Sequence, residues 1–223
     1  MLKDLLNAWR DRSLLNTMYG EFKEMLKNAE WMFSKVTELL LKGGEAGEEL
    51  QKKLFSCDIL INKTERRIRK QIVEHLTIRP GADIAACLVL MSVVKDAERV
   101  GDYCKNLYDV WRLYGGPLKP GPFTDIIAAL REELLVTFEK VTKAFSEEDE
   151  ILGHEVIEKE LAFAKRVDEA VVMLASSQMA VKSAVCYTLA FRHMKRISAH
   201  LGNIASAVVM PVHKIDYFDK KWQ

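Results

Sequence analysis

The chain has 223 residues, of which 29% are charged and 49% hydrophobic, an ordinary composition for a globular protein with a large core. Its formal net charge of +1 gives no bulk electrostatic attraction to nucleic acid or to an anionic membrane. We expect no membrane span, because no run of about 18 apolar residues occurs. The amino end lacks a signal-peptide pattern, so the sequence predicts a cytoplasmic protein.

The cysteines favour reduced thiols over disulfides. No C-x-x-C pair occurs, and each cysteine sits within a helical apolar pattern. A cytosolic chain also keeps its thiols reduced. The four positions are Cys57, Cys87, Cys104 and Cys186.

The first half of the chain predicts three long helices after a short amphipathic lead-in at residues 1–20. Apolar residues then recur with helical spacing: Phe22, Met25, Leu26, Ala29, Phe33, Val36 and Leu40. Gly43-Gly44 ends this helix. A second helix is expected from about 45 to 76, before Arg79-Pro80-Gly81. A third is expected from about 82 to 114, with Asp83 as its cap.

The stretch 115–122 is the clearest linker, because it contains three prolines and three glycines, which cannot continue a helix. The same apolar stripe resumes after it, at Ile127, Leu130, Leu134, Phe138, Val141 and Phe145. A fifth helix is expected at about 147–175 and a sixth at about 180–209.

Three helices, a hinge and three more helices indicate an internal duplication. A short match 97 residues apart supports it, between Glu98-Arg99-Val100-Gly101 and Lys195-Arg196-Ile197-Ser198. The predicted fold is all-α, with two tandem antiparallel three-helix bundles. The repeats are expected at residues 1–114 and 123–210, with the hinge at 115–122 and a C-terminal tail at 211–223.

Two groups of oxygen-bearing side chains each share one helix face. The third helix carries Glu98, Asp102 and Asn106. The second carries Asp58, Asn62 and Glu65. Neighbouring carboxylates on one face repel each other and need compensation if they are buried. Because adjacent helices run antiparallel, we expect the two groups to meet and to offer oxygen ligands suited to Mg, Mn or Fe.

Simpler interpretations of these acids remain open, namely a solvated polar face or interhelical ion pairs with Lys95, Arg66 or Arg99. His193 and His200, seven residues apart, could approach one ion, but satisfied core or surface histidines are the more common case. A phosphate-binding loop, a nucleophile elbow and a ferritin-like Glu-x-x-His pair are all missing from the sequence.

The motif Glu98-Arg99-Val100-Gly101-Asp102 with Asn106, preceded by Asp58, Asn62 and Glu65, resembles the PhoU family of phosphate-uptake regulators. The resemblance extends over nearly the whole chain. It implies a cytosolic, non-catalytic homodimer that acts with a phosphate ABC transporter ATPase and a sensor histidine kinase.

Some PhoU-like proteins bind multinuclear metal clusters on such faces. By that resemblance Glu98 and Asp102 are the motif ligands, with Asp58, Asn62 and Glu65 opposite them. The metal would be a divalent or transition ion (Fe, Zn, Mn or Mg).

The second repeat departs from this pattern, because Lys195 and Ala199 stand where the first repeat has Glu98 and Asp102. A second cluster is therefore not expected. Either the basic side chains of this face pair with acids or an anionic partner, or the site is simply lost.

The sequence thus predicts a PhoU-like regulator of phosphate uptake and starvation signalling that acts by protein–protein contact. Two alternatives are an accessory protein of a sodium–phosphate or other ion transporter, and a carboxylate-metal phosphohydrolase.

Overall fold

The structure is a computed structural model that describes residues 2–43, 48–81 and 83–216. Over these residues it contains six α-helices and one short 3-10 helix. They are α1 (Leu2–Lys42), α2 (Glu48–Ile78), α3 (Ile84–Tyr114), α4 (Pro122–Glu147), α5 (Glu150–Ala175), α6 (Val181–Val209) and η1 (Val212–Lys214). The predicted all-α fold is confirmed. None of the described helices combines the length and apolarity needed to cross a membrane.

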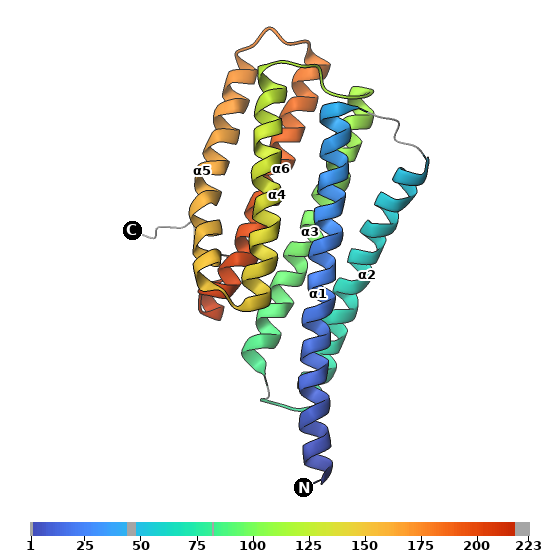
Figure 1. The fold of residues 1–223 in the computed structure, drawn as a ribbon, viewed down its shortest axis with the longest axis vertical. Coiled ribbons are helices and arrows are strands. Elements are labelled where there is room, and N and C mark those ends of the chain that lie inside the picture. Colours follow the sequence, from blue (N-terminus) through green and yellow to red (C-terminus); the bar gives the residue numbers. More distant parts are fainter. Residues whose placement is uncertain (1, 44–47, 82, 217–223) are drawn as a thin grey trace.

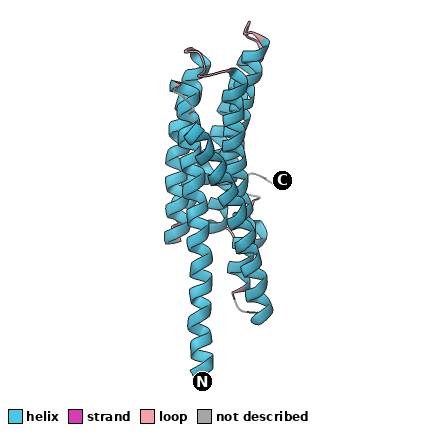
Figure 2. Cartoon of the chain, turned by 90° about the vertical axis from the view of Figure 1, so that its right-hand side faces the viewer, coloured by secondary structure: helices cyan, strands magenta, loops and turns pink. Residues whose placement is uncertain are grey.

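The helices form two antiparallel triplets that lie side by side along one axis (Figures 1 and 2). In each triplet every helix packs against the other two, α1 to α3 in one and α4 to α6 in the other. The triplets meet mainly through α3 and α6, with a smaller contact between α1 and α4. In Figure 1 the first turns of α1 extend beyond the other helices.

The apolar stripes predicted from the sequence meet in one continuous core. Aromatic rings join α1 to α4 across the two triplets: the ring centroids of Phe33 and Phe138 lie 5.6 Å apart, and those of Phe22 and Phe145 lie 4.6 Å apart. Each fully buried phenylalanine contributes about 2–3 kcal/mol by leaving water. Packing of these apolar stripes therefore holds each triplet together and also attaches the two triplets to each other.

Glycine and proline end the helices where the sequence predicts. Gly43 follows α1 with φ 73°, a left-handed conformation that costs glycine nothing, and its N–H donates to the Leu39 carbonyl. Gly115 ends α3 in the same way, donating to Trp111. Pro122 belongs to α4 rather than to the hinge, because its fixed φ suits the first helical position.

Three local predictions are revised by the structure. The segment 1–20 is not a separate lead-in, since α1 runs without a break from Leu2 to Lys42. Asp83 precedes α3 in a left-handed conformation and makes no side-chain cap; its carboxylate lies 3.4 Å from His75 Nε2 instead. α5 begins at Glu150, where the Asp149 side chain caps it by accepting from Leu152 N–H. The predicted boundaries at Gly44, residue 45 and residue 82, and the tail beyond residue 216, lie outside the described residues.

The four cysteines are free thiols. Cys87, Cys104 and Cys186 are buried, as predicted, whereas Cys57 is only half-buried. Burial raises the pKa of the Cys104 thiol well above its ordinary value, so this group stays protonated at neutral pH.

Candidate functional site

The six predicted site residues lie on two adjacent helices, α2 and α3, and we call them the acidic face. They are Asp58, Asn62, Glu65, Glu98, Asp102 and Asn106. Because α2 and α3 run antiparallel, Asp58 comes next to Asp102 while Glu65 comes next to Glu98. The structure thus brings the four carboxylates together, as the helix-face argument predicted.

A lysine that the sequence reasoning did not consider lies between the two helices. Lys105 Nζ lies 3.1 and 3.2 Å from the two carboxylate oxygens of Asp58 on α2, and 3.3 Å from Asp102 Oδ1 on α3. Burial alone would lower the pKa of Lys105, but its hydrogen bonds and attraction to Asp58, and then to Asp102, outweigh this and raise it. Lys105 is therefore a charged bridge between α2 and α3.

Arginines hold the remaining carboxylates. Arg99 Nη1 lies 3.3 Å from Asp102 and its Nε lies 3.5 Å from Glu98. Arg69 on α2 lies 3.1 Å from Glu65. Arg99 was one of the predicted partners, but it pairs with Glu98 and Asp102 within α3 and not between helices as predicted.

The other two proposed counter-ions do not pair with the acidic face in this way. Arg66 Nε donates to the backbone carbonyl of Asn62 at 3.2 Å, and Lys95 is exposed.

Negative charge is concentrated around Glu98 on the acidic face. The Glu98 side chain is only 14% exposed. Burial raises its pKa, as do the charges of Asp102, Glu65 and Asp58, while Arg99 alone opposes them. The predicted repulsion between carboxylates is therefore real.

The two amides contribute less to the acidic face. Asn62 Nδ2 donates to the Asp58 backbone carbonyl of its own helix at 3.0 Å. Asn106 is half-buried on α3, on the face that the i, i+4, i+8 spacing predicted.

The chemistry of these donors suits a hard divalent ion, but their present arrangement does not. Ligand oxygens of Mg or Ca lie about 2.0–2.6 Å from the ion, whereas the carboxylates here are spaced for hydrogen bonds to an ammonium. Among the side chains that the structure describes, those of residues 14–43, 48–81 and 83–216, no three of His, Cys, Asp or Glu are grouped to hold a metal. In this arrangement the acidic face does not fit a metal ion.

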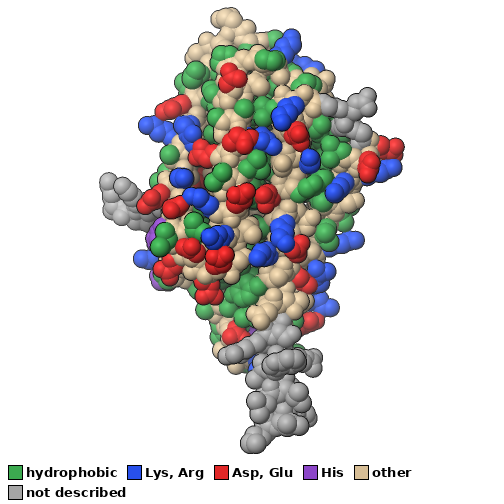
Figure 3. Space-filling model, in the orientation of Figure 1, with side chains coloured by type: hydrophobic (Ala, Val, Ile, Leu, Met, Phe, Trp, Pro, Cys, Tyr) green, Lys and Arg blue, Asp and Glu red, His purple; other side chains and the backbone are tan. Residues whose placement is uncertain are grey.

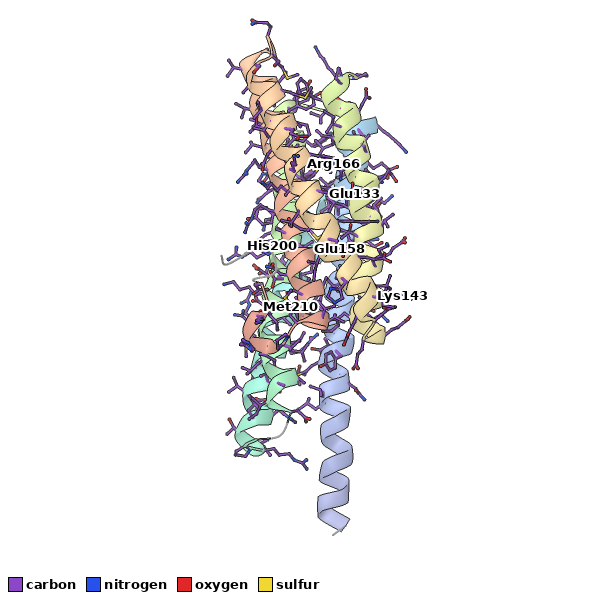
Figure 4. The ribbon with its side chains drawn as sticks, turned by 90° about the vertical axis from the view of Figure 1, so that its left-hand side faces the viewer. Glu133, Lys143, Glu158, Arg166, His200 and Met210 are labelled. Atoms are coloured by element: carbon purple, nitrogen blue, oxygen red, sulfur yellow. The ribbon has the colours of Figure 1, made fainter. Side chains whose placement is uncertain are left out.

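Ion pairs also join the helices of the second triplet, one between α5 and α6 and two between α4 and α5. Lys195 on α6 lies 2.5 Å from Asp168 on α5. Lys140 on α4 pairs with Glu155 on α5. Figure 4 shows Arg166 of α5 beside Glu133 of α4, with which it also forms an ion pair. Lys195 therefore pairs with an acid, as one interpretation of the basic face of the second repeat predicted, and the pair is equally compatible with simple loss of the site.

The two histidines of α6 have separate surroundings, with His200 buried and hydrogen-bonded and His193 half-buried against the Tyr103 ring. His200 Nδ1 lies 2.7 Å from Asp96 Oδ1, and Asn203 Nδ2 donates to the same oxygen at 2.9 Å. The Tyr103 ring packs on both His193 and His200, with centroid distances of 5.7 Å. These contacts tie α3 to α6 at the junction of the triplets.

The junction reflects the internal duplication. Adding the 97-residue offset to Asp96 and Tyr103 gives His193 and His200. The contact of Asp96 with His200 and the contact of Tyr103 with His193 therefore occupy equivalent places in the two repeats. Sequence reasoning missed this network, and the shared offset was the signal that could have found it.

Comparison with known proteins agrees with this geometry. Residues 22–110 match the family model of the PhoU domain. The chain is 25% identical over 163 residues to a "Phosphate-specific transport system accessory protein PhoU homolog" from Synechocystis sp., covering 70% of this chain and 71% of that protein.

Solved structures show the same fold. The PhoU structure from Pseudomonas aeruginosa aligns with a TM-score of 0.71 at 22% identity, over 89% of this chain and 93% of the other. The phosphate transport system regulatory protein PhoU from Streptococcus pneumoniae aligns with a TM-score of 0.66 at 16% identity, over 92% and 94%. The domain match in the first triplet and the cyanobacterial relative relate this chain to the PhoU family, and the aligned structures show that it has the fold of PhoU proteins.

Proposed function

We propose that this protein regulates phosphate transport by binding other proteins. The observation that carries the proposal is the extended similarity to a relative named as an accessory protein of a phosphate-specific transport system. The fold supports it, since both aligned structures are PhoU proteins and each is covered almost completely. The proposal places the protein in the cytoplasm, acting on a phosphate ABC transporter ATPase, a sensor histidine kinase, or both.

The charged surface supports recognition rather than catalysis. The four carboxylates of the acidic face are engaged in ion pairs with Lys105, Arg99 and Arg69, so they are not poised to exchange protons with a substrate. Figure 3 shows acidic and basic side chains interspersed over the visible face. Such a surface favours selective association through complementary charge.

The cellular test is deletion of the gene from its own host, followed by uptake of radiolabelled phosphate in phosphate-rich medium. We expect uptake and expression of starvation genes to rise, and the intact gene to restore both. Unchanged uptake and expression would contradict the proposal.

Binding of purified components tests the mechanism. We expect the protein to bind the ATPase subunit of the transporter or the cytoplasmic part of the kinase in biolayer interferometry. Binding to a sodium–phosphate carrier in place of both would favour the accessory-protein alternative. A phosphatase assay with added Mn or Mg should show no turnover, and turnover would favour the phosphohydrolase alternative.

Two finer points stay predictions. The family resemblance implies a homodimer, which light scattering would report as a mass twice that of one chain. It also implies a metal on the acidic face, which the carboxylates in their present arrangement do not fit. If metal is found in the purified protein, exchanging both Glu98 and Asp102 for alanine should abolish it.

A further inference from the structure

The acidic face carries its own counter-charges. Asp58 and Asp102 contact Lys105, Asp102 and Glu98 also contact Arg99, and each contact is 3.5 Å or shorter. A metal ion bound on this face would neutralise these carboxylates and connect α2 to α3. Lys105 already connects α2 to α3, and Lys105 and Arg99 together offset most of this negative charge.

We propose that the Lys105 ammonium takes the place of a metal ion in this protein, so that α2 and α3 are bridged and part of the negative charge of the acidic face is offset without one. The inference concerns this face alone and does not depend on the proposed regulatory role. It accounts for the disagreement between the resemblance, which implies a metal, and the arrangement of the carboxylates, which does not fit one.

The position of Lys105 is that of a bridging cation. An ammonium has three N–H donors. Here they reach both oxygens of Asp58 on α2 and one oxygen of Asp102 on α3. A divalent cation at the same carboxylates would meet the positive charge of Lys105 at close range, so the ion and the ammonium exclude each other. Lys105 must swing away before a metal can bind.

Burial separates this contact from an ordinary surface ion pair. Exposed lysine pairs are loose and contribute little. The Asp58 side chain is 12% exposed and that of Lys105 is 31% exposed. Withdrawing Lys105 would leave Asp58 partly buried without a counter-ion, next to the carboxylate of Asp102.

The second triplet has a lysine–aspartate pair at a different position, and there the aspartate is more exposed, at 56%. Lys195 stands where the first triplet has Glu98, and it bridges α6 to Asp168 on α5. Asp168 in turn stands where the first triplet has Gln71, by the same 97-residue offset. The second and third helices of both triplets are therefore joined by a lysine–aspartate bridge.

The test compares the unmodified protein with Lys105→Met, which keeps much of the side-chain length and removes the charge. Lys95→Met is the matched control, because Lys95 is an exposed lysine on the same helix. Metal content is measured by elemental analysis, Mn binding by calorimetry, and thermal unfolding with Mn or with EDTA.

We expect the unmodified protein and Lys95→Met to contain no stoichiometric transition metal and to unfold at the same temperature with Mn or with EDTA. Lys105→Met should bind Mn at least about tenfold more tightly, and saturating Mn should raise its unfolding temperature by about 5 °C. Adding Asp58→Asn to Lys105→Met should remove the gained binding.

Three outcomes would overturn the inference. One is a metal present at one or more ions per unmodified chain, whose removal by EDTA lowers the unfolding temperature. Another is Mn binding to Lys105→Met no tighter than to the unmodified protein. The third is gained binding that survives Asp58→Asn. Should Lys105→Met fail to fold, Lys105→Gln replaces it, and the metal content of the unmodified protein still decides.

Discussion

His200 on α6 binds Asp96 on α3 with an Nδ1 to Oδ1 distance of 2.7 Å, and this contact joins the two triplets through their largest shared interface. Both side chains are about nine-tenths buried. Asn203 donates to the same carboxylate oxygen, and Arg196 approaches the other ring nitrogen of His200 at 3.4 Å. The attachment of one repeat to the other thus includes a buried polar network as well as apolar packing.

Replacing Asp96 by alanine should therefore destabilise the whole protein. The substitution leaves His200 Nδ1 and the Asn203 amide buried without their acceptor, at a cost of about 3 kcal/mol in the free energy of unfolding. Urea unfolding followed by circular dichroism would measure it. Asp96→Asn retains an acceptor oxygen and should lose less. Equal stability of Asp96→Ala and the unmodified protein would show that the network contributes nothing.

Much of this fold could be predicted from the sequence because helical periodicity and glycine or proline punctuation are local signals. The meeting of Asp58 and Glu65 with Glu98 and Asp102 was also predictable, since it needs only helix faces and antiparallel neighbours. In contrast, Lys105 occupies the third position after Asp102, a spacing that allows contact within α3 but does not reveal its reach to Asp58 on α2.

The contacts between triplets were harder to predict for the same reason. The bond between Asp96 and His200 spans 104 residues, and it depends on the register of two helices that no local pattern fixes. The capping role expected for Asp83 failed because its backbone is left-handed and its carboxylate turns toward His75. Local rules set which residues are helical, whereas tertiary packing decides which polar partner each side chain finds.

Replacing glycine by alanine at two positions gives a second prediction, because the added Cβ has different neighbours at each position. A Cβ at Gly20 on α1 has nothing within 4 Å, so Gly20→Ala should gain about 0.5–1 kcal/mol from helix propensity. A Cβ at Gly153 on α5 would lie 2.7 Å from Val209 Cγ1 and 3.4 Å from the Ala205 backbone oxygen on α6. Gly153→Ala should cost about 1–3 kcal/mol.

Thermal unfolding of both glycine variants measures the difference. Gly20→Ala serves as the control for the intrinsic preference of alanine in a helix. If Gly153→Ala were stabilised as much as Gly20→Ala, then α5 and α6 could separate slightly without cost, and the close approach at Gly153 would not be required for packing.

His193 should make stability depend on pH. Burial lowers its pKa, with Asp109 opposing, so the unfolded chain binds a proton more readily than the folded protein. Because the pKa of His193 is lower in the folded protein, its contribution to stability is fully present above the pKa of the unfolded chain, about 6.5. This contribution is lost as pH falls through the pKa of the folded protein. His193→Gln should therefore weaken the fall in stability below about pH 6.5. His154→Gln, at an exposed position on α5, is the control and should keep the original profile.

Glu30 on α1 should have the opposite dependence. Burial raises its pKa, and the charge of Glu139 on α4 raises it further. Because the pKa of this acid is higher in the folded protein, its contribution to stability is favourable below the pKa of the unfolded chain, about 4.3. This contribution is lost as pH rises through the pKa of the folded protein. At neutral pH the ionised Glu30 therefore opposes the packing of α1 on α4. Glu30→Gln should be more stable than the unmodified protein at about pH 7, and this advantage should disappear at about pH 4.

Glu139→Gln supplies the matched variant for Glu30, because it removes the repelling charge and leaves Glu30 in place. It should recover part of the same gain at about pH 7. Urea titrations at both pH values would test the pair. An advantage of Glu30→Gln that is the same at pH about 4 and pH about 7 would mean that the effect comes from helix propensity or packing, and not from the buried charge between the two repeats.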